Sequence, residues 1–111
     1  MEFKELIEFI DQEDKRLNKY YHDHTDKDKH ILARTVKLNE EVGELCNEVL
    51  SHTHFQRKQK LDACNKENLP DEFADVILTT LLLARSMDVD VEEALTEKIK
   101  KIKARNYELP V

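Results

Sequence analysis

The stretch FADVILTTLLLA, residues 73–84, decides the fold class. Its apolar residues fall nearly all the way round a helical wheel, so a helix formed here must be buried on most of its sides. The chain of 111 residues contains one Gly and two Pro, whereas an all-β domain needs many tight turns. The sequence therefore predicts an all-α fold, a four-helix-bundle-type subunit in a single domain over residues 1–111.

Three more segments repeat apolar residues at helical spacing. The first lies between Phe3 and Tyr20, and the second runs from about residue 28 to residue 50. The helix that contains residues 73–84 is expected to start near Pro70, and the last one at Asp90, where Asp90 and Glu93 form a capping pair. Polar connections are expected over residues 21–30 and 51–69. Because four short helices cannot surround one of their own, we expect a homodimer or homotetramer.

Charge and composition exclude several classes of function. The formal net charge of −6 argues against nucleic acid as a partner, because nucleic-acid binding requires a surplus of positive charge. The single Gly excludes the glycine-rich phosphate loops, which need at least two. The longest uncharged stretch, residues 76–84, is too short to cross a bilayer, and the acidic N-terminus is no signal peptide. We expect a cytoplasmic protein without a membrane partner.

Two pairs of carboxylates have the spacing of a metal site. Glu72 and Asp75 lie three residues apart on the apolar helix, and Glu41 and Glu44 repeat this spacing on the second helix. If these helices are adjacent and antiparallel, four carboxylates share one small volume, where they either protonate or bind a cation. Hard oxygen ligands suit Mg²⁺, with Mn²⁺ as the second choice. The alternative is that these acids form an ordinary solvated face.

The arrangement of these acids resembles a known family. An E-E-x-x-E motif at Glu40, Glu41 and Glu44 is followed by a spacer of residues 45–71 and by E-x-x-D at Glu72 and Asp75. Together with DEFADVILTTLLLA, MDVD and the Lys-rich EKIKKIKARNY, the pattern is similar to the MazG-like all-α nucleoside triphosphate pyrophosphohydrolases over residues 35–107. The resemblance implies that a nucleoside triphosphate is split between its α- and β-phosphates into a monophosphate and pyrophosphate. The removal of non-canonical nucleotides is one role that this resemblance implies.

The resemblance also implies roles for single residues. Mg²⁺ is expected on the four carboxylates Glu41, Glu44, Glu72 and Asp75. Glu40 would lie beside them, as a further ligand or as the group that orients the attacking water, so Glu40 and Glu41 are the catalytic candidates.

The basic residues of the last helix are the candidates for substrate binding. Lys98 and Arg105 lie at the edge of its apolar stripe, and we expect these two and Lys101 to contact phosphate. The alternative is that they only complement the helix dipole. The chain departs from the family at Ile102, where many members have Asn soon after the second lysine.

Two other functions remain open at this point. One is a phosphoribosyl-ATP pyrophosphohydrolase, a related enzyme with another substrate. The other is a non-catalytic helical interaction protein, in which the acids are solvated and the apolar helix serves oligomerisation. The connection over residues 51–69 is a hypothetical lid over the substrate.

Overall fold

In the computed structural model, which describes residues 1–20, 26–53 and 68–107, every regular element is a helix. The helices are α1 (Phe3–Tyr20), α2 (Lys27–His52), α4 (Asn68–Ser86) and α5 (Val91–Lys103). Within the described residues, the all-α prediction is therefore confirmed. The expected connection over residues 21–30 is too long, because α2 already begins at Lys27. The expected connection over residues 51–69 lies mostly outside the described residues.

Local sequence explains where the helices begin. Asp26 caps α2, and its carboxylate accepts hydrogen bonds from the backbone N–H groups of Asp28 (2.9 Å) and Lys29 (3.5 Å). Asp90 caps α5 in the same way, since its Oδ1 accepts from Glu93 N at 3.1 Å, as the sequence predicted. Pro70 lies in the first turn of α4, where its missing N–H removes no helical bond.

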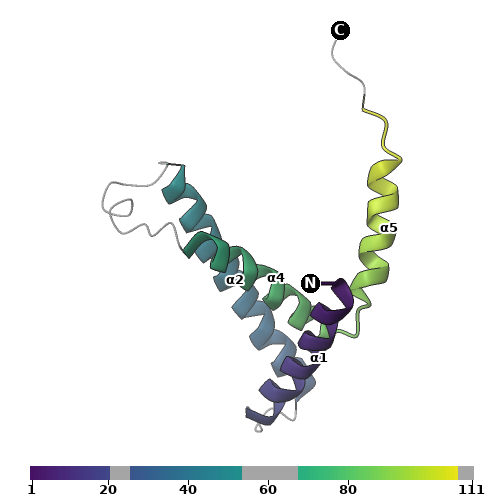
Figure 1. Cartoon of the computed structure of the whole chain (residues 1–111). Coiled ribbons are helices and arrows are strands. Elements are labelled where there is room, and N and C mark those ends of the chain that lie inside the picture. The colour runs from purple at the N-terminus through teal and green to yellow at the C-terminus, as the bar shows by residue number, and fades with distance from the viewer. Residues whose placement is uncertain (21–25, 54–67, 108–111) are drawn as a thin grey trace.

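The α2–α4 pair forms the centre of the fold. The two helices lie side by side and run in opposite directions, and α1 packs against α4 (Figure 1). Among the described residues, the buried apolar side chains are Ile10 of α1 and Leu81 of α4. The sequence predicted that α4 is buried on most of its sides. In a single copy it is not, because Phe73 and Ile77 remain 48% and 53% exposed.

Arg34 connects the three packed helices. It extends from α2, and its Nη1 atom donates to Asp14 Oδ1 of α1 at 2.7 Å. The same nitrogen donates to the backbone oxygen of Leu82 at 2.9 Å and to the hydroxyl of Ser86, both on α4. Both members of the Arg34–Asp14 ion pair are shielded from solvent, with side chains 9% and 14% exposed. A buried pair of this kind fixes the relative positions of the helices.

Helix α5 does not take part in this packing. It follows the C-terminal end of α4 and leads away from the α2–α4 pair (Figure 1). Its apolar residues Leu95, Ile99 and Ile102 are exposed. The expected four-helix bundle is therefore incomplete within one copy, because three helices pack together and the fourth does not. None of the helices in the described part of the chain has the length and hydrophobicity that a bilayer crossing requires.

Candidate metal centre

Three carboxylates from two helices meet where α4 begins. Glu41 comes from the middle of α2, and Glu72 and Asp75 come from the first turns of α4. Each offers one oxygen atom, and these three oxygens all lie within 4.8 Å of one another. The spacing of three residues places Glu72 and Asp75 on one face of α4, as the sequence predicted, and the antiparallel pairing of the helices brings Glu41 to that face.

Two oxygen atoms of this cluster are buried without a hydrogen-bond partner in the described structure. They are Oε2 of Glu41 and Oε2 of Glu72. Glu41 as a whole is only 6% exposed. Its other oxygen, Oε1, accepts from Lys37 Nζ at 3.0 Å. A buried carboxylate oxygen without a partner is unfavourable, and a cation bound at these two atoms would supply the missing interaction.

Burial and charges at the cluster shift the pKa values of Glu72 and Lys37. Burial raises the pKa of Glu72 above the ordinary value of a glutamate. Negative charges nearby raise this pKa further, in decreasing order those of Glu44, Asp75, Glu41 and Glu48. The hydrogen bond to Glu41, followed by the charge of the same carboxylate, raises the pKa of Lys37. Lys37 therefore stays protonated beside the Glu41 carboxylate, which lies 3.0 Å from its Nζ atom.

The cluster fits a small divalent cation. Mg²⁺ binds oxygen at about 2.0–2.1 Å, so ligands on opposite sides of the ion are about 4 Å apart. Oxygens that are already within 4.8 Å of one another need only a small movement to reach that spacing. A donor set made only of carboxylates favours Mg²⁺ or Mn²⁺ over softer metals.

Two further acids of the predicted site lie at its edge. Glu44 is exposed and is not one of the three clustered carboxylates, but its charge has the largest electrostatic effect on the pKa of Glu72. Glu40 is also exposed, and its Oε2 lies 3.9 Å from Lys37 Nζ. Their metal-binding and catalytic roles therefore stay predictions.

The predicted phosphate-binding residues do not reach the cluster within one copy. Lys98, Lys101 and Arg105 belong to the exposed C-terminal part of the chain, and α5 leads away from the site (Figure 1). The turn after α4 causes this separation. It places the start of α5 at the C-terminal end of α4, whereas Glu72 and Asp75 lie at its N-terminal end.

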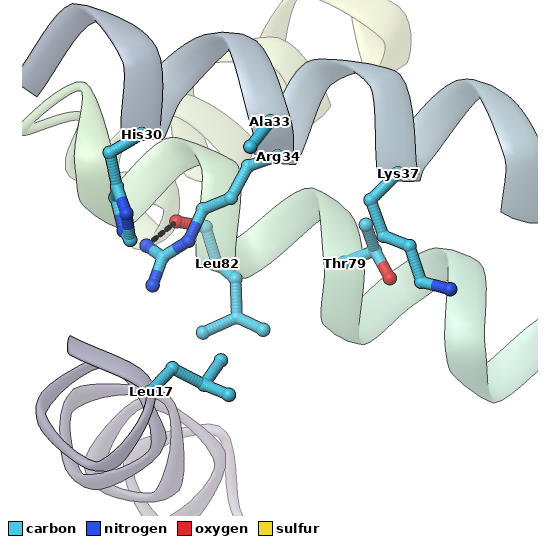
Figure 2. A pocket seen from close by; sticks show the side chains of 7 residues that line it. All are labelled: Leu17, His30, Ala33, Arg34, Lys37, Thr79 and Leu82. Carbon is cyan, nitrogen blue, oxygen red and sulfur yellow. Dashed lines mark hydrogen bonds between the residues drawn. The ribbon is translucent and has the colours of Figure 1, made fainter. Parts of the chain in front are cut away.

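A cavity that the sequence did not predict adjoins the carboxylates. It has a volume of about 350 Å³ and is shown in Figure 2, lined by Leu17, His30, Ala33, Arg34, Lys37, Thr79 and Leu82. Lys37 connects it to the cluster through its ion pair with Glu41, and Thr79 lies one helical turn beyond Asp75. The sequence did contain a pattern that indicates this polar wall of the cavity. Arg34, Lys37 and Glu41 are spaced by three and four residues and so share one face of α2.

Comparisons with known proteins show the family of the chain. Residues 29–109 match the family described as the MazG nucleotide pyrophosphohydrolase domain. The chain is also similar to the uncharacterized protein YpjD of Bacillus subtilis (strain 168), with 33% identity over 75 residues. That match covers 68% of this chain and 66% of YpjD, slightly less than two thirds of its length. No solved structure matches the chain significantly. The family match covers most of the chain, which therefore belongs to the MazG nucleotide pyrophosphohydrolase family.

Proposed function

We propose that this protein is a Mg²⁺-dependent nucleoside triphosphate pyrophosphohydrolase that converts a ribo- or deoxynucleoside triphosphate into the monophosphate and pyrophosphate. The single observation that carries the proposal is the cluster of Glu41, Glu72 and Asp75, with two buried oxygens that lack a partner. The family match supports the type of reaction.

The carboxylates hold the metal in this proposal. Glu41, Glu72 and Asp75 are the central ligands, and Glu44 joins them from the next turn of α2. The bound ion neutralises negative charge on the phosphates and lowers the pKa of a bound water. Lys37 holds the Glu41 carboxylate in position through their 3.0 Å ion pair. Glu40, exposed on the same helix, orients the attacking water or adds a ligand.

The rest of the substrate needs cations and a cavity. Lys98, Lys101 and Arg105 bind phosphate oxygens, for which ammonium and guanidinium groups are suited. The nucleoside lies in the 350 Å³ cavity, which is within the range of small-molecule sites, about 300–1,000 Å³. Leu17 and Leu82 point into the same space (Figure 2) and give it apolar walls for a base.

The proposed active form is an assembly of identical copies, either a dimer or a tetramer. The described part of one copy buries only Ile10 and Leu81 among its apolar side chains. Large apolar residues on α2, α4 and α5 remain exposed, including Leu32, Phe73, Ile77, Leu95 and Ile99. A second copy that covers such residues supplies the missing burial.

The test is a product analysis with a panel of ribo- and deoxynucleoside triphosphates, non-canonical nucleotides and phosphoribosyl-ATP, each with Mg²⁺. We expect monophosphate and pyrophosphate from at least one nucleoside triphosphate, and no turnover by Glu72→Gln. Asp71→Asn is the matched control, because Asp71 is exposed, adjacent in sequence and outside the cluster. Turnover of phosphoribosyl-ATP alone, or undiminished turnover by Glu72→Gln, would contradict the proposal.

A further inference from the structure

Arg34 uses only one of its two terminal nitrogens to hold the helices together. Its Nη1 atom donates to Asp14 Oδ1, to the backbone oxygen of Leu82 and to the hydroxyl of Ser86. Its Nη2 atom is buried without a hydrogen-bond partner in the described structure, and the side chain as a whole is only 9% exposed. Buried N–H groups without an acceptor are unfavourable. The Nη2 group is therefore a donor that can still bind an acceptor.

This nitrogen belongs to the wall of the cavity of about 350 Å³. Arg34 lines the cavity together with Leu17 of α1 and Leu82 of α4. Figure 2 shows one terminal nitrogen of Arg34 bonded to the backbone oxygen of Leu82, whereas the other points away from this oxygen, on the side of Leu17. In small-molecule sites with mainly apolar walls, a few polar groups of this kind fix the orientation and the identity of the ligand.

The charge of Arg34 is already balanced by Asp14. The two side chains form an ion pair of 2.7 Å, and Asp14 is only 14% exposed. A phosphate at Nη2 would bring further negative charge close to this shielded carboxylate, which is unfavourable. A neutral carbonyl oxygen accepts the same hydrogen bond without that cost. The Nη2 group therefore fits an uncharged acceptor better than a phosphate.

The order of side chains along α2 matches the order of groups in a nucleotide. Glu41 of the metal centre, Lys37 and Arg34 follow one another on one face of the helix. Arg34 lies roughly 10 Å along α2 from Glu41, at about 1.5 Å per residue. With the phosphates at the metal and the nucleoside in the cavity, the base is the part of the substrate that reaches Arg34.

We propose that Nη2 of Arg34 selects bases with a carbonyl oxygen at the edge remote from the sugar, so that the substrates are nucleotides of uracil, thymine, guanine or hypoxanthine. This inference rests on the proposed function and adds the substrate class. The carbonyl oxygens at this edge of thymine and guanine accept hydrogen bonds, and uracil and hypoxanthine carry the same groups. Adenine and cytosine carry an amino group there, which is a donor. Two donors then face each other, and the buried N–H groups of Arg34 stay unpaired.

Pairs of substrates that differ in little besides this group test the proposal in the wild-type protein. UTP and CTP form one pair, and ITP and ATP form the other. With Mg²⁺ we expect kcat/KM to be about 10- to 100-fold higher for the carbonyl member of each pair that is hydrolysed, as for the loss of one hydrogen bond to a charged group. A ratio near one, or a preference for the amino member, would overturn the proposal.

The variant Arg34→Lys separates the selection of the base from the packing of the helices. Lysine keeps the charge and can pair with Asp14, but it has no second nitrogen for the base. We expect the ratio within each pair to fall below about threefold, mainly through a lower kcat/KM of the carbonyl member. A purely structural Arg34 would lower both members equally and leave the ratio unchanged, which would also overturn the proposal.

The matched control is Arg85→Lys. Arg85 likewise connects α4 to α1, because it pairs with Asp11 at 2.9 Å, and it is not among the residues that line this cavity. The control should keep the wild-type ratio within each pair. A ratio that fell as far as in Arg34→Lys would show that any weakened helix contact abolishes the preference, and would contradict a specific role of Nη2.

A binding measurement needs no turnover. UMP and CMP, and then IMP and AMP, are titrated into ¹⁵N-labelled protein, and NMR follows the Nε–Hε signal of Arg34. We expect a saturable shift, with a dissociation constant about tenfold or more lower for the carbonyl member of a pair. Equal dissociation constants, or no shift with any of the four, would overturn the proposal. If no triphosphate is hydrolysed, the proposed function fails, while this titration still decides which bases the cavity takes.

Discussion

Replacing Glu41 by Gln should change stability in opposite directions with and without metal. In the metal-free protein Glu41 is 6% exposed, and its carboxylate lies within 4.8 Å of an oxygen of Asp75. Two unit charges at that distance repel by about 0.9 kcal/mol in bulk water and by about 3.5 kcal/mol at an effective dielectric constant of about 20. Gln removes this repulsion, and its oxygen can still accept from Lys37. The lost ion pair with exposed Lys37 offsets less than about 1 kcal/mol.

We therefore expect metal-free Glu41→Gln to be more stable than the wild type by about 1 kcal/mol or more, which is about 4 °C in the thermal midpoint. Mg²⁺ at ten times its dissociation constant should stabilise the wild type by about 1.4 kcal/mol and the variant by much less. The assay is thermal unfolding by circular dichroism in EDTA and in Mg²⁺. Glu40→Gln, the same change at an exposed neighbour, should change the metal-free free energy of unfolding by less than about 0.5 kcal/mol.

The reasoning would be refuted if metal-free Glu41→Gln were less stable than the wild type. It would also be refuted if Mg²⁺ stabilised both proteins equally, because the buried carboxylate would then have no part in binding the ion.

Three further predictions concern stability. Arg34→Met should destabilise the protein by about 3–5 kcal/mol, because it leaves Asp14 without its buried partner. Urea unfolding measures this loss, and the double variant Arg34→Met/Asp14→Leu should recover part of it. The raised pKa of Glu72 means that the folded state binds a proton more tightly than the unfolded state, so metal-free stability should gain from this group as the pH falls from 7 towards the ordinary glutamate range. The variant Glu72→Gln should lack this gain when the free energy of unfolding is measured as a function of pH. An identical pH dependence of the two proteins would contradict the prediction. Gly43→Ala should stabilise α2 by about 0.5–1 kcal/mol, because a Cβ at Gly43 meets no atom within 4 Å; a lower thermal midpoint would show that another backbone approaches there.

Features that depend on local periodicity were predictable from the sequence. The helices follow from apolar spacing, and the start of α5 follows from the cap at Asp90, whose carboxylate accepts from Glu93 N as expected. The meeting of Glu41, Glu72 and Asp75 was also predictable, because two pairs with a spacing of three residues face each other once their helices are antiparallel.

Features that depend on turns and on long-range contacts were not predictable. Helix α5 follows a turn in which Asp88 adopts the left-handed conformation and pairs with Lys27, and no helical pattern contains these features. The connection that Arg34 makes to α1 and α4 was also missed, since a charged residue on an inner helix face gives no indication of its partners. Sequence spacing likewise treats Glu44 and Glu41 alike, whereas the structure buries Glu41 and leaves Glu44 exposed.

The central claim is that this carboxylate cluster directs hydrolysis of a nucleoside triphosphate between its α- and β-phosphates. The most direct measurement is ³¹P NMR of one triphosphate that the panel identifies as a substrate, incubated with the wild-type protein and Mg²⁺ and, in parallel, with Glu72→Gln. The account predicts equal amounts of monophosphate and pyrophosphate from the wild type and unchanged triphosphate from the variant. Diphosphate and inorganic phosphate as the products, or the same products from Glu72→Gln, would contradict it.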